Sequence, residues 1–261
     1  MVPEVKRSAH ELVPEGDMRD GSAVQRLTMS GLSSPGATLA SGVTGGFVSG
    51  LLIGGVGGRV AMLVLRLTSD PALRGTETDD GFTIGVFSTQ TLFLLAVTAG
   101  LGILGGLFYL IVRGWIPEHR RVVVMAVFFG LVGGAGLIRT DGIDFKELSP
   151  LPLAVAMFVA IAIAYGAVMA WLTERMLHPG SVMRRRRWAW IAGLLPLVPA
   201  NIVGILVLLL ATLVLIIRHS APGTIAAWRS SVAMWIGRTL LFVATVTSGV
   251  KLVRDSVEIL S

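Results

Sequence analysis

The chain has 261 residues, of which 53% are hydrophobic and only 15% are charged. Soluble domains carry about a quarter of charged residues, so the apolar surplus is expected to face lipid, with room for about six spans of about 20 residues and for no second folded domain. Cysteine is absent, which excludes disulfides, thiolate metal sites and cysteine nucleophiles.

Residues 1–40 mix charged residues with Pro, Gly and Ser and contain no apolar core. This composition predicts a disordered cytoplasmic tail. The stretch from Ala9 to Asp20 is acidic where a secretory signal would have its apolar region, so the first span is expected to act as its own insertion signal. Residues 41–261 are predicted to form an all-α, polytopic transmembrane bundle of about six spans.

The apolar run from Ser41 to Leu67, which contains the first predicted span at residues 43–65, carries glycine at an unbroken spacing of four. Residues four apart lie on one face of an α-helix, and a face without side chains lets a neighbouring membrane helix approach closely. The span therefore predicts a tight helix contact along one side. The glycines of this stripe are Gly42, Gly46, Gly50, Gly54 and Gly58.

Small residues repeat at the same spacing in later spans, with Gly102 and Gly106 in residues 91–112, and Gly130 and Gly134 in residues 122–138. These stripes predict that the first three spans pack together through Gly- and Ala-rich interfaces. Further spans are expected at residues 151–172, 188–217 and 230–249. The span at 188–217 contains Pro196 and Pro199, so it is either one kinked helix or a re-entrant segment followed by a helix.

Charge patterning predicts the orientation. The loops after the second and fourth spans hold most of the arginines, which favours the cytoplasmic side and places both termini there. The Arg- and Ala-rich composition is typical of a GC-rich genome, so the bacterial cytoplasmic (inner) membrane is the expected location. The basic run is expected to contact anionic lipid headgroups rather than nucleic acid. It consists of Arg184, Arg185, Arg186 and Arg187.

Arg59 and Arg238 are charged residues inside predicted spans. Such residues cost at least about 2.5 kcal/mol on insertion scales and usually face protein or water. Both fall in the outer halves of their spans, which predicts a polar cavity that opens outward. Alternatively, both arginines reach the outer headgroups and serve only the structure. The acidic residues expected at the mouth of the cavity are Asp79, Asp80, Asp141 and Asp144.

Asn201 follows the two prolines of the fifth predicted span. A broken helix with a polar side chain near the midplane is how several transporters build a substrate site. A kinked helix whose Asn201 bonds to a neighbouring helix is the structural alternative.

Enzymatic motifs are absent from the sequence. All four histidines lie in the tail or at span ends, no span contains Asp or Glu, and the glycine-rich stretch at 55–59 lacks the Gly-Lys-Ser/Thr of a phosphate loop. No catalytic, cofactor or metal site is therefore expected.

The sequence favours a small-solute or ion transporter or channel. The alternative is a non-catalytic subunit or scaffold, with a homo-oligomer or other membrane subunits as partners and the glycine stripe of the first span facing a foreign helix.

Overall fold

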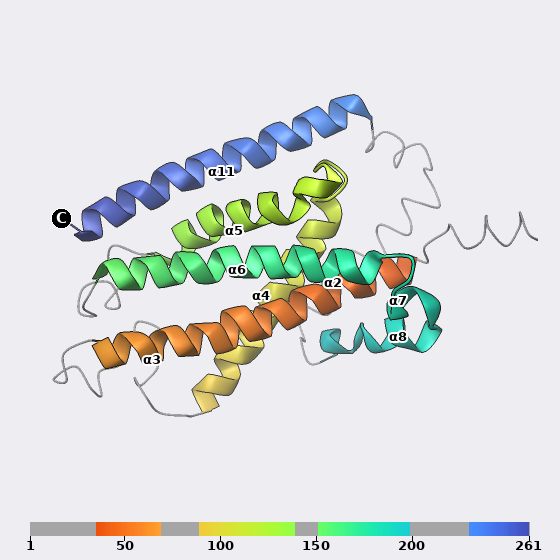
Figure 1. The fold of residues 1–261 in the computed structure, drawn as a ribbon, viewed down its shortest axis with the longest axis horizontal. Coiled ribbons are helices and arrows are strands. Elements are labelled where there is room, and N and C mark those ends of the chain that lie inside the picture. Colours follow the sequence, from red (N-terminus) through yellow and green to blue (C-terminus); the bar gives the residue numbers. More distant parts are fainter. Residues whose placement is uncertain (1–34, 69–88, 139–150, 199–229, 261) are drawn as a thin grey trace, which may run out of the picture. The chain divides into compact units, whose positions relative to one another are not determined.

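The computed structural model describes residues 35–68, 89–138, 151–198 and 230–260, and within these ranges every regular element is helical. Residues 35–261 belong to one compact unit. The helices in chain order are α2 (Pro35–Ser49), the π-helix η1 (Gly50–Gly57), α3 (Gly58–Thr68), α4 (Thr89–Val112), the 3₁₀ turn η3 (Glu118–Arg120), α5 (Arg121–Leu137), α6 (Leu151–Leu177), α7 (Val182–Arg185), α8 (Arg187–Ala192), the 3₁₀ turn η5 (Leu195–Leu197) and α11 (Ser231–Leu260) (Figure 1).

Five segments of the described chain are helical, long and apolar enough to cross a membrane. These are Gly36–Leu65, which joins α2, η1 and α3, then Thr91–Val112, Glu118–Leu137, Leu151–Arg185 and Ser231–Ile259. The predicted all-α transmembrane bundle is thereby confirmed. The first helix begins at Pro35 rather than at residue 41, so the end of the predicted tail is helical.

The predicted fifth span is described only in part. Trp188–Leu197 forms a shorter apolar segment, made of α8 and η5, that lies against the beginning of α2. The indole of Trp190 covers Gly36, and Thr44 Oγ1 donates to the carbonyl of Gly193 at 2.9 Å. The rest of this span, with Asn201, lies outside the described residues.

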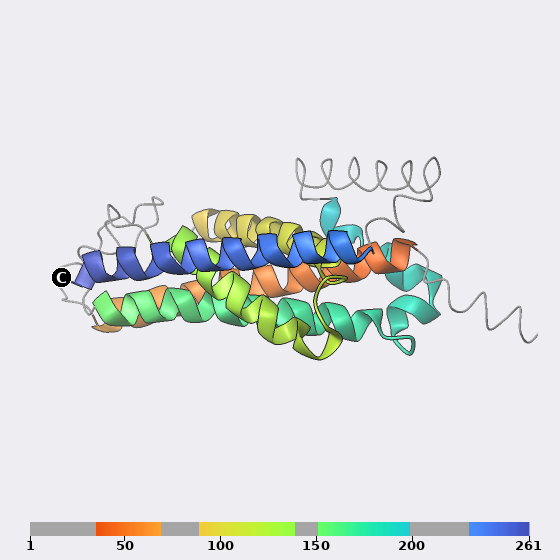
Figure 2. The same cartoon turned by 90° about the horizontal axis from the view of Figure 1, so that it is seen from above.

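The helix termini gather at two opposite ends of the bundle, here called the α2 end and the α3 end. The α2 end holds the start of α2, the turn between α4 and α5, the end of α6 and the start of α11 (Figures 1 and 2). The α3 end holds the end of α3, the start of α4 and the end of α11. The described chain thus begins and ends at opposite ends of the bundle. The prediction that both termini lie on one side of the membrane also depends on residues 1–34. Residues 1–34 lie outside the described residues.

Helix α2 and η1 pack on α4 with their backbones in contact. A Cβ on Gly42, Gly46 or Gly50 would overlap atoms of α4, because Gly106, Gly102 and Thr98 lie directly opposite. The helices are farther apart toward the α3 end. A Cβ on Gly54 would lie 3.3 Å from the Cβ of Thr98, and no described atom of another helix lies within 4 Å of the Cβ position of Gly58. The glycine face of the first span is therefore covered by a helix of the same chain.

Helix α5 packs on α6 rather than on the first span. Gly130 lies against Ile163, and Gly134 lies between Val159 of α6 and Leu252 of α11. On the α6 side, Gly166 lies against the carbonyl of Met125. The predicted cluster of the first three spans is therefore replaced by two close pairs, α2 with α4 and α5 with α6, with α6 also touching α2.

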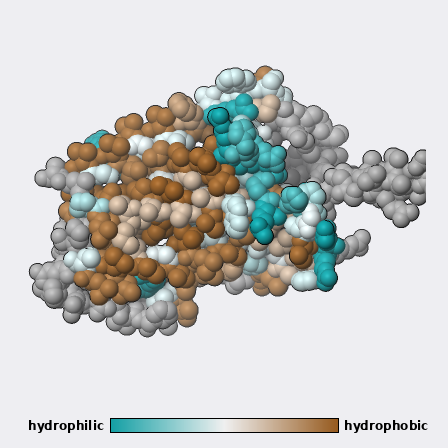
Figure 3. Space-filling view, in the orientation of Figure 1, coloured by the Kyte–Doolittle hydropathy of each residue, from teal (hydrophilic) through white to brown (hydrophobic). Residues whose placement is uncertain are grey.

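Large apolar side chains cover the outside of the bundle. In Figure 3 the brown hydrophobic surface spreads over the helices and meets a teal hydrophilic band at the α2 end. Helix α11 is the most exposed of the five described spans, since only 11% of its 18-residue apolar stretch is buried inside the bundle. A surface this apolar has to face lipid or other membrane helices. The exposed large apolar residues of α11 include Trp235, Ile236, Leu240, Phe242, Val243, Val246, Val250, Val253 and Val257.

Candidate polar sites at the two ends of the bundle

The first polar site lies near the α3 end, where η1 passes into α3. Arg59 is the second residue of α3, which begins where the π-helix ends. It is half-buried and donates through Nη2 to Thr91 Oγ1 at the beginning of α4. π-helical segments are rare and occur frequently at functional sites. The sequence indicated an arginine in a span here, but it gave no sign of the π-helix.

The π-helix is built from a glycine-rich sequence, since four of its eight residues are glycine. On an α-helix with 3.6 residues per turn, residues four apart drift around the axis by about 40° per step. The wider π-helical turn counteracts this drift, so that Gly54 and Gly55 both still face Thr98 of α4. The contact between the first span and α4 is thereby extended toward Arg59.

The second polar site is an ionic cluster at the α2 end, here called the Glu174 cluster, formed by Tyr109, Arg113, Arg121 and Glu174. Tyr109 Oη donates to Glu174 Oε1 at 2.6 Å, and Arg113 binds both carboxylate oxygens at 2.9 and 3.1 Å. Arg121 Nη1 donates to Oε2 at 3.1 Å. A carboxylate offers about four acceptor positions, so Glu174 is saturated.

The Glu174 cluster joins three elements of the chain. Tyr109 comes from α4, Arg121 begins α5 and Glu174 lies in the last turns of α6. Burial by itself lowers the pKa of Arg113, but the hydrogen bonds and charge of Glu174 outweigh it and raise the pKa above its ordinary value. Arg113 therefore stays protonated and holds α4 to α6.

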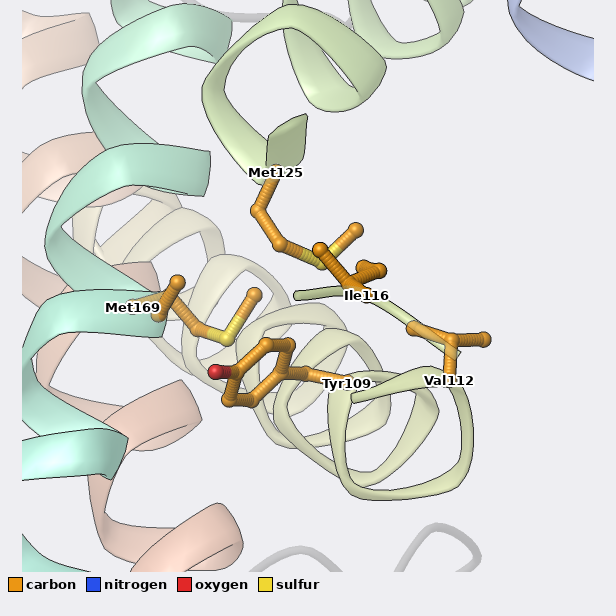
Figure 4. Close-up of a cluster of buried hydrophobic side chains, with 6 residues drawn as sticks. Tyr109, Val112, Ile116, Met125 and Met169 are labelled. Carbon is orange, nitrogen blue, oxygen red and sulfur yellow. The ribbon is translucent and has the colours of Figure 1, made fainter. Parts of the chain in front are cut away.

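Apolar side chains close the space beneath this cluster. Tyr109 is fully buried, and its ring lies with Met125 of α5 and Met169 of α6, while its hydroxyl points toward α6 (Figure 4). The polar tip thus reaches Glu174, and the ring contributes to the core. The sequence shows Glu174, Arg113 and Arg121 only as charges near span ends, so their pairing was not predicted.

Arg238 lies at the α2 end and not near Arg59. Its Nε donates to the carbonyl of Trp115 at 2.7 Å, in the turn between α4 and α5. The indole of Trp115 in turn packs on Gly237. The structure therefore does not bring the two arginines of the predicted cavity together. The other residues assigned to it, Asp79, Asp80, Asp141, Asp144 and Asn201, lie outside the described residues.

The fold and both sites define a class of protein: a multi-pass, all-α membrane protein whose helices are in close contact. Comparison of the chain with protein-family models, with curated proteins and with solved structures found no match.

Proposed function

We propose that this membrane protein conducts or transports a small solute or ion, without enzymatic chemistry, and that the first span supplies the polar part of the path. The observation that carries the proposal is that Arg59, in the first turn of α3 just after the π-helix η1, is hydrogen-bonded to Thr91. An ionisable residue inside a span is costly, and such residues often mark the route of a solute or ion.

Open backbone beside Arg59 supports the same proposal. No described atom lies within 4 Å of the Cβ position of Gly58, and only the carbonyl of Leu52, in the same helix, lies near that of Gly57. A side-chain-free stretch next to a cation leaves room for a solute to approach both the backbone and the guanidinium. Irregular backbone at membrane depth is tolerated where it lines such a space.

Cysteine accessibility tests the proposal, because the chain contains no cysteine of its own. We expect Arg59→Cys and Thr91→Cys to react with a small, membrane-impermeant methanethiosulfonate in proteoliposomes. The reaction should block flux in an osmotic-swelling or ion-flux assay. Val60→Cys is the matched control, since Val60 neighbours Arg59 and its side chain is 53% exposed on an apolar surface. Equal inertness of all three positions, or labelling that leaves flux unchanged, contradicts the proposal.

The excess of arginine at the α2 end supports an orientation with this end in the cytoplasm of a bacterial cell. Among the described residues, this end carries arginines in the α4–α5 turn, in the last turns of α6 and in α7. The only acidic residues described there are Glu118 and Glu174. In this orientation Arg59 lies nearer the outer face.

A second candidate function is that of a non-catalytic subunit, and the exposure of α11 favours it. From the sequence, a helix of another subunit was expected on the glycine stripe of the first span, but α4 of the same chain packs on that face. Helix α11 offers apolar surface instead. Phe242→Ala with Val246→Ala should then release a stoichiometric membrane subunit, whereas Leu52→Ala with Val60→Ala should not. Equal retention by both variants contradicts the subunit role.

A further inference from the structure

The segment that follows Glu174, residues 175–187, forms a basic surface that neither polar site uses. It runs from the last turn of α6 through α7 and is here called the arginine turn. Arg175, Arg184, Arg185 and Arg186 have described side chains here, and none of the ion pairs among the described residues includes them. The sequence has no Asp or Glu between Glu174 and Asp255. The arginine turn therefore lacks an acidic partner close in sequence.

The acid nearest in sequence is already saturated. Glu174 accepts four hydrogen bonds within its own cluster, so it has no acceptor position left for Arg175 or Arg184. The Nε of Arg184 is buried and has no hydrogen-bond partner in the described part of the chain. The side chains of Arg185 and Arg186 are exposed. The turn thus presents several guanidinium donors whose counter-charge has to come from outside the bundle.

Hydrogen bonds hold the arginine turn in place. Ser181 Oγ donates to the carbonyl of Met176 in α6, and the backbone N–H groups of Arg184 and Arg185 both donate to the carbonyl of Ser181 at 3.1 Å. Beyond the turn, α8 is fixed to α2 by Trp190 and Gly193. The guanidinium groups are therefore carried on an ordered turn rather than on a free loop.

Tryptophans indicate the depth at which the arginine turn lies. The side chains of Trp171 and Trp188 are 52% and 61% exposed, and the guanidinium of Arg175 lies over the ring of Trp171 at 5.6 Å. Tryptophan is enriched at the level of lipid headgroups. In Figure 3 the hydrophilic band borders the apolar surface directly. The arginines are thus at the depth where the phosphates of a lipid leaflet lie.

From these observations we infer that the arginine turn binds the phosphate-bearing headgroups of anionic phospholipids in the adjacent leaflet. Guanidinium groups bind phosphate oxygens in a bidentate manner, and a basic residue near an anionic surface contributes about 1 kcal/mol. Two exposed arginines then change the affinity for an anionic lipid by about fivefold each. The inference does not depend on transport, because the turn is at the opposite end from Arg59.

Native mass spectrometry of the full chain, titrated with phosphatidylglycerol or phosphatidylcholine in detergent, tests the inference. We expect phosphatidylglycerol to bind the wild-type protein more tightly, and Arg185→Gln with Arg186→Gln to weaken its binding about 25-fold. Arg254→Gln removes an exposed charge at the α3 end and should change binding less than twofold. The charge-conserving pair Arg185→Lys with Arg186→Lys should retain most of the affinity.

Three results would overturn the inference. The first is phosphatidylglycerol binding by the double glutamine variant that equals wild type. The second is equal binding of the two lipids by the wild-type protein. The third is complete displacement of phosphatidylglycerol by millimolar inorganic phosphate, which would assign the surface to a soluble anion instead. An unchanged melting temperature in phosphatidylcholine identifies a correctly folded variant, and we expect it because both side chains are exposed.

Discussion

Gly46 of α2 and Gly102 of α4 meet backbone to backbone. A Cβ on either residue would overlap the carbonyl oxygen of the other, so neither position accepts even a methyl group without moving a helix. Close approach of this kind lets van der Waals contact hold membrane helices together when there is no water to expel. The contact between α2 and α4 therefore depends on glycine at both positions.

The glycine stripe provides a matched pair of substitutions. Gly46→Ala forces a methyl group into backbone atoms that cannot rotate away, and overpacking costs about 1–3 kcal/mol. Gly58→Ala meets no described atom within 4 Å, and it replaces glycine in a helix with a better helix former, a gain of up to about 1 kcal/mol. We expect the melting temperature in mild detergent to fall for Gly46→Ala and to stay level or rise for Gly58→Ala. The reverse order would show that α2 and α4 are not in this contact.

Removal of the charge of Glu174 should destabilise the α2 end. Glu174→Gln leaves Arg113 without a carboxylate and leaves Arg121 with only the exposed Glu118 at 3.6 Å. Breaking a buried pair costs about 3–5 kcal/mol. Because the side chain of Glu174 is 23% exposed, we expect a loss at the lower end of that range. Tyr109→Phe removes one neutral donor to the carboxylate and should cost less, about 1.5–2 kcal/mol, because both arginines keep their partner. Chemical denaturation of the two variants measures both losses, and equal losses would show that charge pairing is not what stabilises the cluster.

Tyr165 connects α6 to α4 through one hydrogen bond. Its hydroxyl donates to the carbonyl of Gly102 at 3.0 Å, beside the contact with Gly46. Since that carbonyl belongs to the α4 backbone, Tyr165→Phe should cost about 0.5–1.5 kcal/mol without changing the packing of the ring against Phe129. Denaturation of the Gly46→Ala, Tyr165→Phe and double variants gives their coupling. Strictly additive losses would mean that the two contacts are independent.

Much of the fold was predictable because lipid imposes long apolar helices with clear ends. The expected span at 91–112 ends with α4 and begins two residues after it, and the expected span at 122–138 differs from α5 by one residue at each end. A spacing of four identifies the face of a helix that carries glycine, but not the helix that covers it. The stripe of Gly130 and Gly134 therefore revealed a contact face, whereas its partners in α6 and α11 came only from the structure.

The polar sites were less predictable. Charged residues at span ends can set the orientation of the chain in the membrane or form ion pairs between helices. The sequence does not distinguish the two roles. The hydrogen bond between Tyr109 and Glu174 joins residues 65 positions apart, so no local pattern reveals it. Arg238 illustrates the opposite error: its position in the sequence suggested that it lines the same cavity as Arg59, but its side chain donates to the backbone of Trp115. The π-helix could not be predicted, because glycine spacing alone does not distinguish it from an α-helix.

The most direct test of the account is the side of the membrane on which each end of the bundle lies. Arg186→Cys reports on the α2 end and Glu258→Cys on the α3 end, in a chain with no other cysteine. With an impermeant maleimide applied to intact spheroplasts, we predict labelling at residue 258 and labelling at residue 186 only after permeabilisation. Labelling of both positions from the same side would contradict the described arrangement of membrane-crossing helices.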